Sequence, residues 1–315
     1  MEKITIDIGV AVYNEAGHIG SVLEMITHQK LANFYIREII VLNDASTDGT
    51  GEIIEKIIAQ KSVANLRLIN LAVNQGKANG MNIIFGEANA DLLCIFDSDI
   101  IISDENSLEK WLAPYLAPDK EKVGLACAMS DEKRRGLFDF YYFIYNFGTG
   151  LFERISYKFS QHPMFAVGAT LSLPKKVYKA IKFPAGIYRS DAFIYMFMKT
   201  KGLKLAIVRQ PRFQLLREEK FGNFTKLSNL GAFIESQART NSIPANHIDF
   251  FGDIVKEEYK HPPLRILLIA FFQQFLINPI GGIGYFFLKI IAFLAIKVFT
   301  YNIFCTWRRE PSSSH

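Results

Sequence analysis

Short apolar segments alternate with amphipathic segments over roughly the first hundred residues, and this alternation constrains the fold more than any other feature. Isoleucine or valine occupies every second position from residue 4 to residue 12, which predicts a strand. Further strands are expected at residues 38–42, 66–71 and 92–96, with apolar residues at helical spacing between them. Strands that alternate with helices predict a parallel sheet with right-handed crossovers, so the expected fold class is α/β.

Three of the expected strands end in polar residues. These residues are Tyr13, Asn14 and Glu15 after the first strand, Asn43 and Asp44 after the second, and Asp97, Ser98 and Asp99 after the fourth. Ligands bind at the carboxyl ends of the strands in parallel sheets. We therefore expect the three groups to meet at one edge of the sheet.

Asp97 and Asp99 follow an apolar strand that is expected to be buried on both faces. Two carboxylates one residue apart are costly in such a place unless a cation meets them. Their hard oxygen ligands suit Mg²⁺ or Mn²⁺ that carries the phosphates of a substrate. The alternative is a turn with two solvated acids.

Charge and cysteine content exclude several other classes of protein. The formal net charge of +5 is modest, and no run of like charge is long enough for a nucleic-acid-binding arm, so no nucleic-acid partner is expected. The 3 cysteines lie far apart, which indicates neither a disulfide framework nor a zinc site and favours a reducing cytosol. Residues 1–15 lack a basic segment followed by an apolar core, so no secretory signal is expected.

The C-terminal part of the chain is strongly apolar. Residues 264–277 and 285–304 are apolar, and Asn278-Pro279 and Gly281-Gly282 are expected to interrupt them. A spanning helix needs about 20 apolar residues, and the first segment is shorter. Basic residues on both sides favour cytoplasmic ends. The pattern predicts a membrane hairpin or a pair of interfacial helices, and the alternative is a buried helical pair at a dimer contact.

The second half of the chain has a weaker pattern. It predicts helices at 108–116 and 190–199, strands at 123–129, 165–173 and 203–208, and a mixture of loop and helix over 209–239.

Four motifs resemble those of the family 2 glycosyltransferases. VAVYNE, IIVLNDASTDGT, NQGKANGMN and IFDSD occur in the family's order, and the resemblance is specific over residues 4–102. It implies the GT-A fold, a Rossmann-like and mostly parallel sheet flanked by helices, followed here by C-terminal hydrophobic helices. It also implies three parts: residues 1–102 bind the nucleotide sugar, 103–255 bind the acceptor, and 256–315 form a hydrophobic, membrane-associated helical segment.

The resemblance assigns roles to single residues. Tyr13 would lie against the base, Asn14 and Glu15 would bond to base or ribose, and Asp44 would accept a hydrogen bond from the pyrimidine or its ribose. Lys77 would approach the diphosphate. The implied donor-binding residues are Val12, Tyr13, Asn14, Glu15, Asp44, Lys77, Asp97 and Ser98. Val12 stands where the family often has proline. The alternative for residues 44–49 is a turn followed by helix capping, the role expected of Ser46 and Asp48.

In this family Asp97-Ser98-Asp99 corresponds to the metal-binding DXD motif. Asp99 would bind Mg²⁺ or Mn²⁺ directly, and Asp97 would contact the ribose or water on the metal. Transfer with inversion also needs a carboxylate that removes a proton from the acceptor hydroxyl. The family's aspartate at a helix start corresponds to Asp191, although Ser190 replaces the usual preceding acid. The alternative for Asp191 is a first-turn residue favoured by the helix dipole.

The expected function is metal-dependent inverting transfer of one sugar from a UDP- or GDP-sugar to a lipid-linked or cell-envelope glycan. The signature of processive synthases, Gln-x-x-Arg-Trp, is absent from the sequence, which favours a single sugar per event. The expected location is the cytoplasmic face of the membrane, contacted through residues 264–307; a homo-oligomer is left open. The alternatives are a nucleotidyltransferase, which would need a Gly-rich basic loop after the first strand, a receiver-like domain, and a membrane-tethered nucleotide-sugar-binding protein without catalysis.

Overall fold

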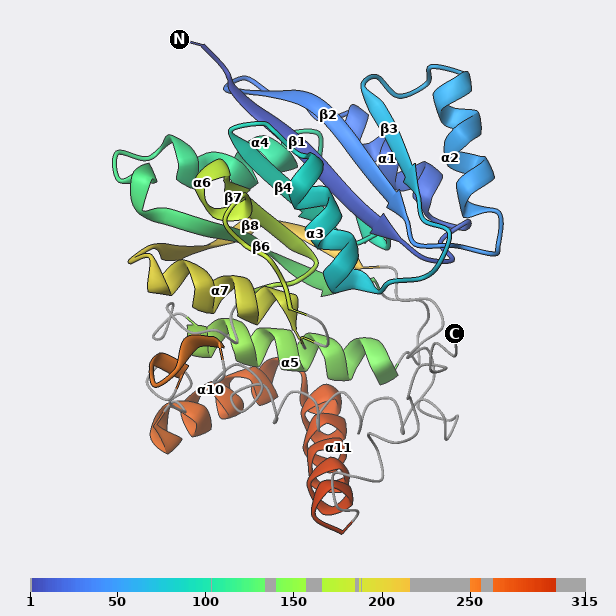
Figure 1. Ribbon diagram of the computed structural model, residues 1–315. Helices are drawn as coiled ribbons and strands as arrows, with labels where there is room; N and C mark the ends of the chain where they lie inside the picture. The colour runs from blue at the N-terminus through green and yellow to red at the C-terminus, as the bar shows by residue number, and fades with distance from the viewer. Residues whose placement is uncertain are drawn as a thin grey trace.

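The computed structural model describes residues 2–102, 104–133, 140–156, 166–184, 187, 189–215, 250–255 and 263–298. Within these residues, eight strands form one sheet in the order β3-β2-β1-β4-β7-β6-β8-β5 (Figure 1). The strands are β1 Ile4–Val12, β2 Phe34–Asn43, β3 Leu66–Asn70, β4 Leu92–Phe96, β5 Ile100–Ile101, β6 Val123–Glu132, β7 Thr170–Pro174 and β8 Lys204–Leu215. The α-helices are α1 Ile19–Thr27, α2 Thr50–Ala59, α3 Lys77–Glu87, α4 Ser107–Leu112, α5 Phe140–Ser156, α6 Lys175–Tyr178, α7 Ser190–Thr200, α10 Leu264–Ile277 and α11 Pro279–Val298.

The first half of the sheet is parallel, as predicted from the alternating pattern. β1 lies parallel to β2 and β4, and β2 lies parallel to β3. In the second half, β7 is antiparallel to both β4 and β6, while β6 and β8 are parallel. The expected α/β sheet flanked by helices is therefore confirmed, and one sheet takes its strands from both of the parts proposed as residues 1–102 and 103–255.

Both faces of the sheet are covered, which explains the continuous apolar run in β4. Leu92, Cys94 and Phe96 pack with α1, α2 and α4 on one face, whereas Leu93 and Ile95 pack with α3 and α7 on the other. None of the five side chains is more than 4% exposed. Full burial of such a side chain contributes about 1.5–3 kcal/mol, so neither face of this strand tolerates a polar residue.

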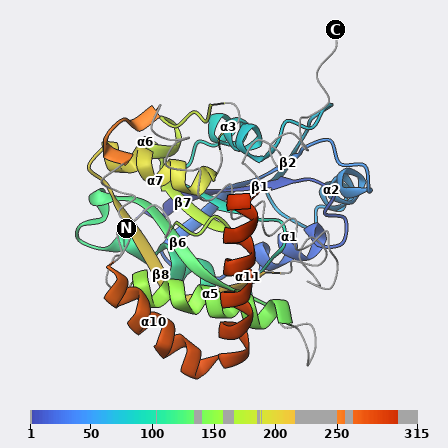
Figure 2. The same cartoon turned by 90° about the horizontal axis from the view of Figure 1, so that it is seen from below.

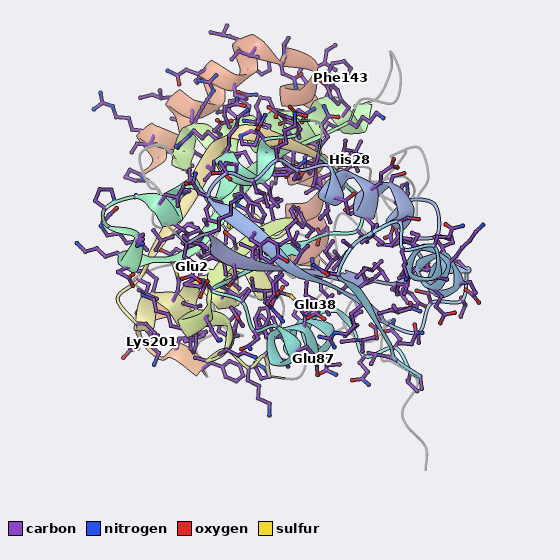
Figure 3. All side chains as sticks on the ribbon, turned by 90° about the horizontal axis from the view of Figure 1, so that it is seen from above. Glu2, His28, Glu38, Glu87, Phe143 and Lys201 are labelled. Carbon is purple, nitrogen blue, oxygen red and sulfur yellow. The ribbon has the colours of Figure 1, made fainter. Side chains whose placement is uncertain are left out.

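One buried charge joins the first two strands. Asp7 in β1 is fully buried and accepts hydrogen bonds from Nε and Nη2 of Arg37 at 2.8 and 2.6 Å. It also accepts backbone hydrogen bonds from Asn89 and Ala90, just after α3. The hydrogen bond from Arg37 to Asp7 raises the pKa of the guanidinium. A second arginine, Arg67, bridges the half-buried Glu38 at 2.7 Å and the exposed Glu87 at 2.8 Å, both labelled in Figure 3.

Several element boundaries differ from the prediction. The helix expected at 108–116 ends at Leu112 and continues as a 3₁₀ turn, Ala113–Leu116, because Pro114 lacks the N–H that an α-helix needs. The strand expected at 165–173 begins only at Thr170. Residues 209–215 were expected to be loop or helix but extend β8, with Phe213 and Leu215 almost fully buried.

Asn278 and Pro279 separate α10 from α11, as expected from the sequence, and they also start the second helix. Oδ1 of Asn278 accepts a hydrogen bond from the backbone N–H of Gly281 at 2.9 Å, which is the geometry of an N-cap. Pro279 then occupies the first helical position, where its fixed φ is favourable. The expected interruption at Gly281-Gly282 is therefore wrong, since both glycines lie inside α11.

The C-terminal helices α10 and α11 pack together on α5, and all three lie on the same side of the molecule (Figure 2). α10 has only 14 residues, about 21 Å at 1.5 Å per residue. No helix in the described part of the chain is long and apolar enough to cross a membrane, so the expected membrane hairpin is not supported there. Residues 299–307 of the segment expected to contact the membrane lie outside the described residues.

Candidate functional site

The polar residues after β1, β2 and β4 leave the sheet at one edge, as expected from the parallel topology. Val12 is the register partner of Asn43, and Val10 is the partner of Phe96. Tyr13, Asp44 and Asp97 therefore follow three neighbouring strands. In Figure 1, β1 and β2 run towards the lower side of the molecule, where α5, α10 and α11 also lie.

Hydrogen bonds join the loop after β1 to the loop after β2. Asn14 has a left-handed backbone with φ of 56°; its N–H donates to Oγ of Ser46, and its Oδ1 accepts from the N–H of Thr47. The N–H of Glu15 donates to Oγ1 of Thr50 at 2.9 Å. The Asn14 side chain thus shapes this loop, while Tyr13 remains 46% exposed and available for stacking.

Asp48 fastens the same two loops. Its Oδ2 accepts from the N–H of Ala16, and its Oδ1 accepts from the N–H and hydroxyl of Thr50 at the start of α2. Burial raises the pKa of Asp48, but these hydrogen bonds outweigh it, so the pKa lies below its ordinary value. The expected turn-and-cap role of Asp48 agrees with these contacts.

Asp44 is buried, and its two carboxylate oxygens each accept a backbone hydrogen bond, from Gln75 at 2.7 Å and from Gly76 at 2.8 Å. Gly76 has φ of 79°, which the turn into α3 requires. Asp44 therefore fixes the turn that presents Lys77. A carboxylate has about four acceptor positions, so two of them remain for a ligand, and the predicted contact of Asp44 with the nucleotide stays a prediction.

Lys77 interacts with two of the predicted acids, through an ion pair with one and through its charge alone with the other. Its Nζ lies 2.5 Å from Oδ1 of Asp97, and its side chain is half exposed. The same ammonium group also lowers the pKa of Asp191, from a different segment of the chain. The sequence could not indicate this second interaction, since Lys77 and Asp191 are far apart in the chain and no shared motif links them.

Asp191 occupies the first turn of α7 and is 6% exposed. Arg189 donates to both of its oxygens, from Nη2 to Oδ2 at 2.7 Å and from Nε to Oδ1 at 3.2 Å. Burial raises the pKa of Asp191, but the Arg189 guanidinium and the Lys77 ammonium outweigh burial, so the pKa lies below its ordinary value. A Cβ atom on Gly168 would lie only 3.2 Å from Oδ2 of Asp191, so a larger residue at this position would crowd the carboxylate.

Arg189 is a site residue that the sequence analysis missed. Its side chain contacts Asp191, and its backbone is left-handed, with φ of 53°. Such a conformation is uncommon for a residue other than glycine and marks a strained, often functional position. The sequence carries no signal for it beyond the short separation from Asp191.

Asp97 and Asp99 are the residues that could hold a metal. In the part of the chain that the structure describes, no three His, Cys, Asp or Glu side chains form a metal-binding group. Mg²⁺ is commonly bound by one or two carboxylates together with substrate phosphates rather than by an all-protein cage. The Lys77 ammonium against Asp97 also shows that this carboxylate accepts a cation. Two carboxylates beside a lysine therefore fit a cation that arrives with a diphosphate. Ser98, between them, is buried.

Comparison with known proteins agrees with this geometry. The family model described as glycosyl transferase family 2 matches residues 7–172, more than half of the chain. Poly-beta-1,6-N-acetyl-D-glucosamine synthases are similar over about a third of this chain. The protein from Staphylococcus epidermidis is 31% identical over 96 residues, which is 30% of this chain and 22% of that protein. The protein from Staphylococcus aureus (strain MSSA476) is 33% identical over 106 residues, 34% and 23% of the two chains. The match thus spans less than a quarter of these relatives.

Two solved structures have a similar fold. A mannosyltransferase from Pyrobaculum calidifontis, in complex with GDP-Man and Mn²⁺, gives a TM-score of 0.62 at 18% identity and covers 98% of this chain and 84% of that chain. Glucosyl-3-phosphoglycerate synthase from Mycobacterium tuberculosis, in complex with Mn²⁺, UDP and glucosyl-3-phosphoglycerate, gives a TM-score of 0.53 at 19% identity and covers 79% of this chain and 80% of that chain. Together with the motifs at the sheet edge, the family match establishes that the chain belongs to glycosyl transferase family 2.

Proposed function

We propose that the protein is a metal-dependent, inverting glycosyltransferase that moves one sugar from a UDP- or GDP-sugar to a lipid-linked or cell-envelope glycan acceptor at the cytoplasmic face of a membrane. One observation carries the proposal. Lys77 is ion-paired with Asp97 and its charge also lowers the pKa of Asp191, so the group expected to hold the leaving diphosphate interacts electrostatically with the group expected to activate the acceptor.

The donor would bind along the edge formed by the ends of β1, β2 and β4. The exposed Tyr13 offers a face for the base, and Asn14 and Glu15 lie beside it. Lys77 would exchange part of its contact with Asp97 for the diphosphate. Mg²⁺ or Mn²⁺, held by Asp97 and Asp99, would neutralise the charge that develops on the leaving nucleoside diphosphate.

Asp191 would act as the general base. Its low pKa keeps the carboxylate ionised at neutral pH, so it can accept a proton from the acceptor hydroxyl. The hydroxyl oxygen forms its bond to the anomeric carbon while the bond from that carbon to the diphosphate oxygen breaks on the opposite side. The proton ends on Asp191, and one displacement of this kind inverts the configuration.

Hydrolysis of the donor tests the metal assignment. Purified protein with manganese is expected to hydrolyse its UDP- or GDP-sugar slowly, and Asp99→Asn is expected to abolish this activity because one metal ligand is lost. Asp119→Asn is the matched control, because Asp119 is an exposed acid far from the sheet edge in sequence and forms no cap hydrogen bond. Hydrolysis that survives both Asp99→Asn and a chelator would contradict the metal assignment.

A thermal-shift screen of nucleotide sugars identifies the nucleotide base and the sugar of the donor. The nucleotide sugar that binds should raise the melting temperature in proportion to the logarithm of its concentration over its Kd. The screen also separates the alternatives. A nucleotidyltransferase would respond to sugar phosphate and nucleoside triphosphate, and a binding protein without catalysis would be stabilised by a donor that it does not hydrolyse.

The apolar outer surface of α10 and α11 supports contact with a membrane surface. We define the apolar face as the exposed large apolar residues of these helices, namely Leu264, Leu268, Ile269, Phe272, Leu276, Ile277, Ile280, Ile283, Phe286, Phe287, Ile290 and Ile291. Apolar surface of this extent marks an interaction site. Helices with such a surface lie in the boundary between headgroups and acyl chains. A second copy of the chain is the alternative occupant.

A further inference from the structure

A cavity of about 460 Å³ lies between α5, α10 and β8, a volume typical of small-molecule sites. Glu153 and Arg154 of α5 and Arg209 of β8 line it together with one face of α10, which includes Ile266, Ile269 and Gln273. The cavity therefore combines charged groups on one side with apolar groups on the other. None of these residues belongs to the donor site described above.

Arg154 is held so that it presents two nitrogens to a ligand. Its Nε donates to Oε1 of Gln274 at 3.0 Å, and Gln274 is itself 7% exposed, which fixes the amide in place. Among the described residues, neither terminal Nη atom of Arg154 has a hydrogen-bond partner. A planar guanidinium with two free nitrogens matches the geometry of a phosphate group.

The charges around the cavity favour an anion. Glu153 accepts a hydrogen bond from Nη1 of Arg212 at 2.7 Å, and Nε of Arg209 lies 4.0 Å from its other oxygen. Arg212 also binds both oxygens of Asp131, at 2.6 and 2.7 Å. Two arginines, Arg209 and Arg212, thus pair with the two carboxylates, whereas Arg154 pairs with the neutral amide of Gln274. Of these three arginines, Arg154 is therefore the one whose positive charge no carboxylate of the described residues compensates.

The apolar side of the cavity continues into the apolar face defined above. Ile269 lines the cavity and is also 40% exposed, so it lies at the rim. Leu268 and Phe272, its neighbours on α10, are 48% and 62% exposed. A ligand whose anionic group sits at Arg154 can therefore lay a hydrocarbon chain over Ile269 and along α10.

An apolar core connects the helices around the cavity to the helix that carries the proposed general base, Asp191. Ala270, which lines the cavity, belongs to one apolar core together with Ile155 of α5 and Phe193 of α7. Phe193 stands two residues after Asp191 in the first turns of α7. The cavity and the Asp191 carboxylate are thus carried by helices that share one core.

We propose that this cavity binds the phosphate group of an amphipathic phosphate ester, with its hydrocarbon chain lying along α10. One part of this proposal rests on the glycosyl transfer proposed above, namely that the ligand is the lipid-linked acceptor of that reaction. Arg154 contacts the phosphate, Gln274 positions Arg154, and Ile266 and Ile269 contact the first carbons of the chain.

Isothermal titration calorimetry of the full chain tests the site directly. The probes are dodecyl phosphate below its micellar concentration, inorganic phosphate and dodecanol. Dodecyl phosphate is expected to bind at least about tenfold more tightly than either of the others, because each buried methylene adds to the affinity of the phosphate contact. Arg154→Gln is expected to weaken the binding of dodecyl phosphate about tenfold or more, because it removes a charge-assisted hydrogen bond.

Matched variants distinguish specific binding in the cavity from non-specific electrostatic attraction of the anion. Arg265→Gln removes the same charge from an exposed position on α10 that does not line the cavity, and is expected to change the affinity less than about twofold. Gln273→Glu adds a negative charge at an exposed lining position where folding is not at risk, and is expected to weaken binding about tenfold. Equal losses in Arg154→Gln and Arg265→Gln would overturn the proposal, as would equal affinity for dodecyl and inorganic phosphate.

The two proposals fail in different ways. Binding of dodecyl phosphate is measured without a nucleotide sugar, so it does not depend on catalysis. Wild-type protein that binds dodecyl phosphate but hydrolyses no donor would refute the glycosyltransferase proposal and leave the cavity site standing. Protein that hydrolyses a donor but binds dodecyl phosphate no better than dodecanol would refute the cavity site alone.

Discussion

Arg189 has two opposing effects on the ability of Asp191 to act as a general base. Its guanidinium compensates for the burial of the carboxylate and keeps it ionised, which a general base requires. The same contact occupies one acceptor position on each oxygen and lowers the affinity of the carboxylate for a proton. The remaining lone pairs face the acceptor in the proposed reaction. The backbone of Arg189 is left-handed, with φ of 53°, a conformation that is strained for a residue other than glycine.

The first prediction follows from the balance of these effects. In Arg189→Gln, burial acts on Asp191 without the guanidinium, so the pKa of the carboxyl rises. A general base works only when ionised, and activity is lost as the pH falls through its pKa. The acid limb of the profile of kcat/KM against pH should therefore move to higher pH. The unpaired buried carboxylate should also lower the free energy of unfolding at neutral pH by about 3 kcal/mol.

The control for this variant is Arg37→Gln, which breaks a similar pair with the fully buried Asp7 outside the site. It should cost comparable stability in urea unfolding and leave the acid limb where it is. An unchanged acid limb in Arg189→Gln would contradict the role of Asp191 as the base. In the wild type, the contribution of Asp191 to stability is present above its ordinary pKa and is lost as the pH falls through its lowered one.

The sequence placed the residues of the proposed donor half at one edge of the sheet, as the structure has them, but it could not give their contacts. Asp97 and Lys77 come from separate motifs, and the structure brings them into contact. Asp44 was expected to touch the nucleotide, yet both oxygens hold the backbone of the turn before Lys77. Arg189 could not be recognised, because none of the motifs includes it and a single arginine two residues before an acid is not a distinctive pattern.

Among the elements, those of the first half were predictable because each depends on local pattern alone. β1 and β4 are buried on both faces, so their apolar residues are visible in a short window of sequence. The end of β8 was not predictable in this way. Arg209 and Arg212 look like loop residues, but their partners are Glu153 and Asp131, which are distant in sequence. Polar residues in that strand are balanced by contacts that a window cannot contain.

The glycines of α11 show the same limitation for helices. In the sequence they resemble a helix break, but they permit close packing against α5. A Cβ atom on Gly281 would clash with the backbone carbonyl of Phe143, the α5 residue labelled in Figure 3, and one on Gly284 would lie 2.8 Å from Ile144. Backbone atoms cannot move aside as a flexible side chain can, so the position requires glycine.

The second prediction concerns this contact. Gly281→Ala should destabilise the protein by about 1–3 kcal/mol, because the added methyl group forces α11 away from α5. Gly86→Ala is the matched control. It lies exposed in α3 with open space around its Cβ position, so alanine there should stabilise by about 0.5–1 kcal/mol. Urea unfolding measures the change in the free energy of unfolding in both variants. A change of the same sign in the two would show that the close approach of α11 to α5 does not require glycine.

At the scale of the whole molecule, the proposed catalytic edge and the apolar face lie on the same side. β1 and β2 end towards the side occupied by α5, α10 and α11, and both views place the C-terminal helices there (Figures 1 and 2). A membrane at the apolar face would therefore meet the protein close to the edge where the donor is proposed to bind. An acceptor anchored in that membrane would need no extraction from the bilayer to reach Asp191.

The third prediction tests this arrangement. The double variant Phe272→Glu, Leu276→Glu removes two side chains that are 62% and 84% exposed on α10, so folding should be preserved. Each large apolar side chain contributes about 1.5–3 kcal/mol when it leaves water, so the partition coefficient on anionic vesicles should fall at least about hundredfold. Leu116→Glu, an exposed leucine outside the apolar face, is the control and should bind vesicles as the wild type does.

Vesicle flotation measures this partition, and analytical ultracentrifugation without lipid separates the two possible occupants of the apolar face. A membrane-binding face predicts flotation of the wild type and of Leu116→Glu but not of the double variant. If instead the wild type does not float, sediments as a dimer and becomes monomeric in the double variant, the face is an interface between two copies of the chain. The lipid-linked acceptor would then have to reach the cavity beside Arg154 by another path, since α10 would be covered where the hydrocarbon chain is proposed to lie.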